Sequence, residues 1–125
     1  MKIIMLSLTI AVSLTILLVG VARAQNAAEG KNLYSTYCVT CHGDRGKGDG
    51  VAAKGLPQKP ADHTNGAVMN PLSDKFLLDV ISKGGGAVGK SSFMPSWGGA
   101  LSEQQIRDIV AYIRTIAVPA YKPGN

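Results

Sequence analysis

The sequence lacks several features that mark common classes of protein. It is 125 residues long with only two cysteines, and it has no internal repeat and no long low-complexity tract. No segment alternates apolar and polar residues over the length of a strand, so a sheet protein is not expected. No arginine-rich run and no alternation of basic and aromatic residues occurs, which argues against a nucleic-acid partner. The chain is therefore expected to form one small all-α domain that does not bind nucleic acid.

The N-terminus has the layout of a secretory signal peptide. Lys2 gives a short positive start, residues 3–19 are almost wholly apolar, and Ala22-Arg23-Ala24 has small residues where signal peptidase reads the chain. We expect residues 1–24 to be a signal peptide and residues 25–125 to form one exported domain. No cysteine lies near the cleavage point, so a bacterial lipoprotein is not expected. The alternative is an uncleaved membrane anchor, because the apolar run is only slightly shorter than the roughly 20 residues that span a bilayer comfortably.

Three stretches have helical periodicity, and segments rich in glycine and proline separate them. The first covers residues 27–38, and the second begins after Ser73, which is a suitable N-cap. The third begins at a capping box formed by Ser102 and Gln105 and carries a continuous apolar stripe. Between the first two helices lies a loop, residues 43–71, whose length is uncommon in a compact domain. We expect a bound cofactor, rather than backbone hydrogen bonds, to organise this loop.

The chemistry of the chain is concentrated in one five-residue motif, Cys38-Val39-Thr40-Cys41-His42. The pattern Cys-x-x-Cys-His is typical of covalent c-type haem attachment. Two cysteines three positions apart reach the two vinyl groups on one side of a porphyrin and form a thioether with each, and the next residue points its imidazole at the iron. We therefore expect one haem c, bound through Cys38 and Cys41, with His42 as the proximal axial ligand of the iron.

Two other interpretations of the cysteines are open at this point. A disulfide between Cys38 and Cys41 would give a thioredoxin-like redox pair or a structural module, but no strand pattern precedes Cys38 to supply the βαβ context of such a pair. A zinc site would need two further ligands, and only His42 and His63 are available. Haem attachment uses both cysteines and leaves no unpaired thiol in an exported protein.

The second axial ligand is less clearly marked. Met94, followed by Pro95, lies in a glycine-rich loop before the last helix. A thioether is neutral and soft, so it favours ferrous over ferric iron and raises the reduction potential. Proline after the methionine stiffens the loop and fixes the direction of the sulfur. Met69 and His63 are the competing ligands, and the order of segments along the chain favours Met94 without excluding them.

With these residues in place, the sequence resembles class I monohaem c-type cytochromes, both the small bacterial periplasmic members and the cytochrome c modules of respiratory complexes. The resemblance covers the predicted mature domain and includes the glycine-rich run Gly43–Gly50 after the motif. It implies an all-α cytochrome c fold with three main helices around a covalently attached haem. The family crosses its first and last helices at a right angle, and Gly30, Tyr34 and Tyr112 stand where that crossing needs them, with Tyr112 expected to pack across Gly30. Met94-Pro95 matches the family's distal methionine, so Met94 is the expected second ligand.

The resemblance also implies contacts made by the residues around the haem. The second ring nitrogen of the proximal histidine is expected to donate to a backbone carbonyl, here that of Pro57 or Pro60, which tunes the basicity of the ligand. Trp97 is expected either to donate its indole N–H to a haem propionate or to form a wall of the haem pocket.

These expectations describe an electron carrier rather than an enzyme. Iron that keeps both axial ligands rearranges little on electron transfer, and a closed sixth position leaves no room for a substrate. The expected partners are redox proteins that dock transiently at the exposed haem edge in the periplasm. Lysines near that edge, Lys47, Lys54 or Lys90, are candidates for steering acidic partners, and reaction rates independent of ionic strength would count against such steering. The alternatives are a membrane-anchored cytochrome c subunit of a redox enzyme complex, and a haem enzyme or gas sensor with a labile sixth ligand.

Overall fold

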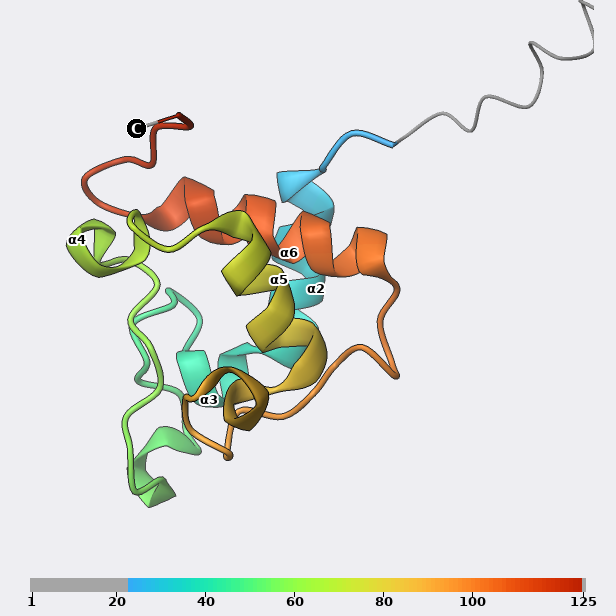
Figure 1. Ribbon diagram of the computed structural model, residues 1–125. Helices are drawn as coiled ribbons and strands as arrows, with labels where there is room; N and C mark the ends of the chain where they lie inside the picture. The colour runs from blue at the N-terminus through green and yellow to red at the C-terminus, as the bar shows by residue number, and fades with distance from the viewer. Residues whose placement is uncertain (1–22, 125) are drawn as a thin grey trace, which may run out of the picture.

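The computed structural model describes residues 23–124, so almost all of the expected signal peptide lies outside the described residues. The described chain is helical and contains no strand, only an isolated bridge between Asn65 and Val118. Figure 1 shows the three long helices packed together, with shorter helices on the loops between them. The elements in chain order are α2 (Ala27–Tyr37), α3 (Val39–His42), η1 (Ala53–Gly55), α4 (Gly66–Met69), α5 (Asp74–Lys83), η2 (Gly85–Val88) and α6 (Glu103–Ile116). The all-α expectation is confirmed, and α2, α5 and α6 are the three main helices.

The ends of the main helices follow the capping residues in the sequence. The Asn26 side chain accepts hydrogen bonds from the first backbone N–H groups of α2, and Ser73 caps α5 in the same way. Ser102 and Gln105 form the expected capping box of α6, in which each side chain accepts from the backbone N–H of the other residue. Gly84, with φ +85°, ends α5 in a backbone conformation that glycine adopts without strain. Local sequence therefore sets where the helices begin and where α5 ends.

Helices α2 and α6 cross at closest approach where α2 has no side chain. A Cβ added to Gly30 would lie 1.8 Å from the carbonyl oxygen of Asp108 and 3.0 Å from the backbone nitrogen of Ile109. The crossing is visible in Figure 1, where α6 lies across α2. The expected close approach at Gly30 is present, but the group that meets Gly30 is the α6 backbone. Tyr112 packs instead on Tyr34 of α2, with ring centroids 5.1 Å apart and an edge-on arrangement.

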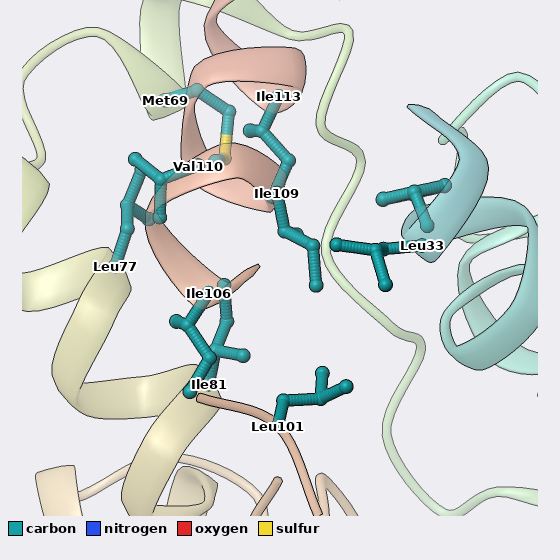
Figure 2. Packing of buried hydrophobic residues seen from close by; sticks show 10 residues of the cluster. Leu33, Met69, Leu77, Ile81, Leu101, Ile106, Ile109, Val110 and Ile113 are labelled. Carbon is teal, nitrogen blue, oxygen red and sulfur yellow. The ribbon is translucent and has the colours of Figure 1, made fainter. Parts of the chain in front are cut away.

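The buried core lies between these helices and α5. Figure 2 shows apolar side chains from α2, α5 and α6 converging, with Leu101 closing the cluster from the segment before α6. Met69 belongs to this core and is only 2% exposed. The core consists of Leu33, Tyr34, Met69, Leu77, Ile81, Leu101, Ile106, Ile109, Val110 and Ile113. Since burial of such side chains is the main favourable term in folding, α6 with its continuous apolar stripe supplies a large share of the fold's stability.

Arg114 ties α6 to the segment that leads into α5. Its guanidinium donates to the carboxylate of Asp74 (Nε–Oδ1 2.8 Å) and to the carbonyl oxygens of Met69 (2.9 Å) and Leu72. The Arg114 side chain is 9% exposed, and Tyr121 covers its guanidinium at 4.0 Å from the ring centroid. These contacts satisfy a nearly buried charge and hold residues 69–74 against the last helix.

The long loop after the motif folds back onto the motif through backbone hydrogen bonds. The N–H groups of Gly48, Gly50 and Ala52 donate to the carbonyls of His42 (2.8 Å), Cys41 (3.1 Å) and Thr40 (2.9 Å). A Cβ on Gly50 would lie 2.3 Å from the Thr40 carbonyl oxygen, so only glycine permits this approach. The expectation that a cofactor rather than the backbone organises this loop is therefore wrong for its first part. Glycine lets the chain turn tightly enough to bond to the motif it has just left.

The Gly30→Ala variant tests the helix crossing. The added methyl group would force the α6 backbone away from α2, and we expect a loss of roughly 3 kcal/mol in the free energy of unfolding, the upper end for overpacking. Denaturant unfolding of the haem-bound protein measures this loss. Gly55→Ala is the matched control, because a Cβ at Gly55 meets no atom within 4 Å. Equal stability of the two variants would contradict the close crossing.

Candidate functional site

One helical turn presents both thiols and the imidazole of the motif. Cys38 is the C-cap residue of α2, and its backbone N–H donates to the Tyr34 carbonyl (2.9 Å). Helix α3 begins directly after it. The N–H groups of Cys41 and His42 both donate to the Cys38 carbonyl, at 3.3 and 2.9 Å. Both cysteines are half-buried free thiols. Burial, with a smaller contribution from Cys41, raises the pKa of the Cys38 thiol to about 12, so the thiol is protonated near neutral pH.

His42 is buried and oriented by one backbone carbonyl. Its Nδ1 lies 3.1 Å from the carbonyl oxygen of Ala61, and because a carbonyl only accepts, Nδ1 carries the proton. Burial lowers the pKa of His42, which keeps the ring neutral. The neutral ring with Nδ1 protonated has its lone pair on Nε2, which is the form in which histidine binds a metal.

The carbonyl that orients His42 is not that of a proline. We expected Pro57 or Pro60, and this expectation is wrong, because the acceptor is Ala61, the residue after Pro60. The Pro60 carbonyl is turned toward Gly48, where an added Cβ would lie 2.2 Å from its oxygen. The chain therefore uses the Pro60 carbonyl for close packing against the glycine-rich loop and leaves the next carbonyl for the histidine.

His63 lies beside His42 rather than opposite it. The two imidazole rings are stacked, with centroids 4.2 Å apart and planes 19° apart. The Nδ1 of His63 is 2.9 Å from the Tyr34 hydroxyl oxygen, and both side chains are buried. Burial, then the neighbouring His42, lowers the pKa of His63 to about 3, so this ring is also neutral. Because the His63 ring lies beside His42, this arrangement does not place it on the opposite side of a metal that His42 would bind.

The two candidate methionines have different surroundings. Met69 is enclosed in the core, whereas Met94 is half-buried on the loop between η2 and α6. The Met94 backbone is held at both ends, since its carbonyl accepts from Gly85 (3.0 Å) and its N–H donates to Ser91 (3.2 Å). A Cβ on Gly85 would lie 2.2 Å from the Ser91 carbonyl oxygen and 3.1 Å from the Met94 Cβ, so the loop is tightly wound around a position that requires glycine.

Trp97 brings the methionine loop next to the motif. The backbone N–H of Trp97 donates to the carbonyl of Ile81 near the end of α5 (2.9 Å). The Trp97 ring packs on Tyr37 with centroids 5.2 Å apart. Tyr37 is the residue directly before Cys38. The loop that carries Met94 is thus fixed both to α5 and to the end of α2, where the thiols begin.

The residues of this region fit a covalently attached haem. Two free thiols on one turn, an imidazole with Nε2 available and a half-buried thioether make up a donor set suited to an iron porphyrin. Several apolar side chains that pack on the core are only half-buried, so part of their surface is left for a large apolar group to cover. They are Cys38, Val39, Leu72, Phe76, Leu78, Val80, Met94, Trp97 and Tyr112. Among residues 23–124, no group of three or more His, Cys, Asp or Glu side chains is placed to hold a metal ion, as a zinc site would require.

An all-helical domain whose first and last helices cross above a Cys-x-x-Cys-His turn has the architecture of a c-type cytochrome. Comparison with family models agrees with this architecture. The family described as "Cytochrome C oxidase, cbb3-type, subunit III" matches residues 25–113, and the chain belongs to this family of cytochrome c domains.

Curated relatives of two kinds are similar to this chain. The subunit FixP of the cbb3-type cytochrome c oxidase of Bradyrhizobium diazoefficiens is 29% identical over 94 residues, which are 75% of this chain and 29% of that protein. The CcoP subunit of Azospirillum sp. is 30% identical over 102 residues, 76% of this chain and 30% of that protein. Cytochrome c6 of Synechococcus sp. is 36% identical over 108 residues, 86% of this chain and 85% of the relative. The chain thus spans less than a third of the oxidase subunits but most of a cytochrome c6.

Solved structures give the same fold. A chain of the Kuenenia stuttgartiensis reducing HAO-like protein complex Kustc0457/Kustc0458 superposes with a TM-score of 0.58 at 28% identity, covering 71% of this chain and 41% of that one. The KustC0563 c-type cytochrome superposes with a TM-score of 0.57, covering 70% of this chain and 96% of that one. At 22% identity the second likeness bears on the fold alone.

The comparisons confirm the resemblance to c-type cytochromes that the sequence motif indicates. The chain is a cytochrome c domain, and the cofactor of this family is covalently bound haem c. Within residues 23–124, no helix has the length and apolar character needed to cross a membrane.

Proposed function

We propose that the chain is a single-electron carrier in which Cys38 and Cys41 hold the haem as thioethers and His42 and Met94 are its axial ligands. The observation that carries this proposal is the state of His42. Its ring is buried and neutral, its Nδ1–H is committed to the Ala61 carbonyl, and its Nε2 is left as a ligand. The residue follows directly after the second of two free thiols on the same turn.

The haem, when bound, supplies an iron that cycles between the ferrous and ferric states. The chain's own part is to hold the ligands still and to keep water away from them. The Ala61 carbonyl stops rotation of the proximal imidazole and raises its basicity. On the other side, hydrogen bonds from Gly85 and to Ser91 fix the Met94 backbone, so the sulfur has little freedom to leave. Such rigid ligation keeps the nuclear rearrangement on electron transfer small.

A closed sixth position also supports a carrier rather than an enzyme. With Met94 on the iron, a substrate or gas would have to displace a ligand whose backbone is hydrogen-bonded at both ends. A thioether favours the ferrous state over the ferric state and raises the potential. Trp97 contributes as a wall of the pocket, a role that its packing on Tyr37 supports.

We place the working protein outside the cytoplasm, with residues 1–24 as a cleaved signal peptide and residues 25–125 as the cytochrome domain. Redox proteins would dock transiently at the haem edge beside Cys38 and Cys41. Lys54 lies on η1, and Ala52 directly before η1 is bonded to Thr40 of the motif, so this lysine is near that edge. The family model, whose description names an oxidase subunit, supports a second candidate, a cytochrome c subunit of a redox enzyme complex. An uncleaved N-terminus would anchor such a subunit in the membrane.

The thioether assignment predicts the behaviour of cysteine variants. Wild-type protein made with a c-type haem attachment system is expected to keep its haem on a denaturing gel, because the bonds are covalent. The double variant Cys38→Ala/Cys41→Ala is expected to lose the haem stain completely, and each single variant to keep a weaker stain through the remaining thioether. Full staining of the double variant would contradict the assignment.

The Met94 assignment predicts a change in the sixth position. Met94→Ala is expected to lose the methionine–iron band of the ferric protein and to bind carbon monoxide rapidly when reduced, because the position is then open. Optical spectra and stopped-flow mixing measure both effects. Met69→Leu is the matched control, since it replaces the core methionine at similar volume and is expected to leave the band and the slow binding unchanged. Rapid carbon monoxide binding by the wild-type protein would instead support a haem sensor or enzyme.

The two candidate settings differ in the N-terminus of the purified protein. A periplasmic carrier is expected to begin at Gln25 and to appear in the soluble fraction. An anchored subunit is expected to keep the residues before Gln25 and to purify with membranes and other subunits. N-terminal sequencing of haem-stained protein separates the two, and an intact N-terminus in the membrane fraction would overturn the cleaved-signal proposal.

A further inference from the structure

A line of packed aromatic and imidazole rings runs from the helix crossing to the proposed proximal ligand. Tyr112 of α6 packs edge-on against Tyr34 of α2, and the Tyr34 hydroxyl meets Nδ1 of His63 at 2.9 Å. The His63 ring then stacks on His42 with centroids 4.2 Å apart. Tyr34 is 1% exposed and His63 is 8% exposed. The turn that carries His42 is thus in ring-to-ring contact with the crossing of α2 and α6.

The direction of the Tyr34–His63 hydrogen bond follows from their surroundings. Burial raises the pKa of Tyr34, so its hydroxyl keeps its proton. If the hydroxyl donates to Nδ1, both buried groups are satisfied, and His63 carries its proton on Nε2. A buried nitrogen without this donor would lose a hydrogen bond that water cannot replace.

The backbone of His63 is held as firmly as its ring. Its N–H donates to the Gly46 carbonyl at 2.7 Å, within the glycine-rich run after the motif. Gly46 has φ +75°, and a Cβ there would lie 3.2 Å from the Tyr34 hydroxyl oxygen and 3.4 Å from the His63 Cβ. The loop therefore turns tightly against the tyrosine and the histidine together, which leaves His63 little room to move.

His42 has two restraints of different kinds. The Ala61 carbonyl, 3.1 Å from Nδ1, fixes the direction of one edge of the ring. The hydrogen bond still allows the ring plane to rock about that edge, since acceptance at a carbonyl oxygen has a broad angular range. The stacked His63 ring, 19° from parallel, blocks that remaining motion from one face.

We propose that His63 is a positioning residue for the proximal ligand, fixing the plane of the His42 imidazole through its stacked ring and its tether to Tyr34. This inference rests on the proposed ligation of the haem iron by His42. The plane of an axial imidazole sets how unpaired spin is distributed over the four quadrants of a ferric haem. With haem bound, His63 would thereby contribute to the electronic asymmetry of the cofactor and to its reduction potential without touching the iron.

The test compares variants by the paramagnetic NMR shifts of the four haem methyl groups and by the reduction potential. His63→Leu removes the ring and the tether, and we expect the spread and order of the methyl shifts to change and the potential to move. His63→Phe keeps a stacked ring but loses the tether, so it is expected to change the shifts about as much as Tyr34→Phe and less than His63→Leu. Tyr34→Phe removes only the hydroxyl and is expected to change the shifts in the same sense as His63→Leu, by a smaller amount.

The double variant Tyr34→Phe/His63→Leu gives the decisive comparison. If Tyr34 acts on the haem through His63, the double variant has the shifts of His63→Leu alone, because the path is already broken. Additive changes, or unchanged shifts in His63→Leu, would overturn the proposal. Met69→Leu, a core change outside this line of rings, serves as the control and should leave the methyl shifts as in the wild type.

Failure of this inference is distinguishable from failure of the proposed function. If wild-type protein lacks covalent haem, or its ferric form is not low-spin, the ligation proposal has failed. If wild-type protein is low-spin with covalent haem and the His63 variants match it, only the positioning proposal has failed. Denaturant unfolding of each variant separates a change at the haem from a general loss of stability.

Discussion

The close contact of α2 and α6 at Gly30 is the constraint on which the rest of the molecule depends. With no side chain at this point, the two backbones approach to a distance that any Cβ would prevent. The contact sets where Tyr34 and Tyr112 meet and holds the end of α2, from which Cys38 and the motif turn continue. It also joins α2 to α6, and most of the sequence between these two helices forms loops around them. The position of the haem-binding turn therefore follows from a packing contact at Gly30, earlier in the helix that leads into the motif.

Asp108 strengthens the same crossing. Its carboxylate accepts from the backbone N–H of Asn26 at 2.8 Å and from the Gln104 side chain at 3.0 Å, although the residue is only 2% exposed. Asn26 in turn caps α2. A negative charge near the first turn of a helix is favourable because of the unpaired N–H groups there. Helix α6 thus supplies both the apolar surface on which α2 packs and the anion that stabilises its start.

Much of this organisation was predictable from the sequence, and the parts that were not share a cause. The three helices and the caps of α5 and α6 depend on neighbouring residues, so Ser73, Ser102 and Gln105 were sufficient signals. The motif likewise carries its chemistry within five residues. Ala61 and His63 gave no such signal, because their roles depend on how a 29-residue stretch of loop folds back through glycines, and nothing local distinguishes one carbonyl or one histidine as the partner of His42. Met94 stays a prediction as a ligand: its place before the last helix is a local signal, whereas the hydrogen bond from Gly85 to its carbonyl depends on how the loop folds.

The contacts of Arg114 have a consequence for how the domain opens. Its guanidinium is hydrogen-bonded to residues 69–74 and covered by Tyr121. Detachment of residues 69–74 or of the C-terminal tail would therefore leave a nearly buried charge without some of its partners. Leaving a buried charge without its partners is costly. Fraying from the C-terminus and local detachment of the loop before α5 are therefore coupled events. Amide hydrogens in these two regions would exchange together in one cooperative opening, as a single foldon.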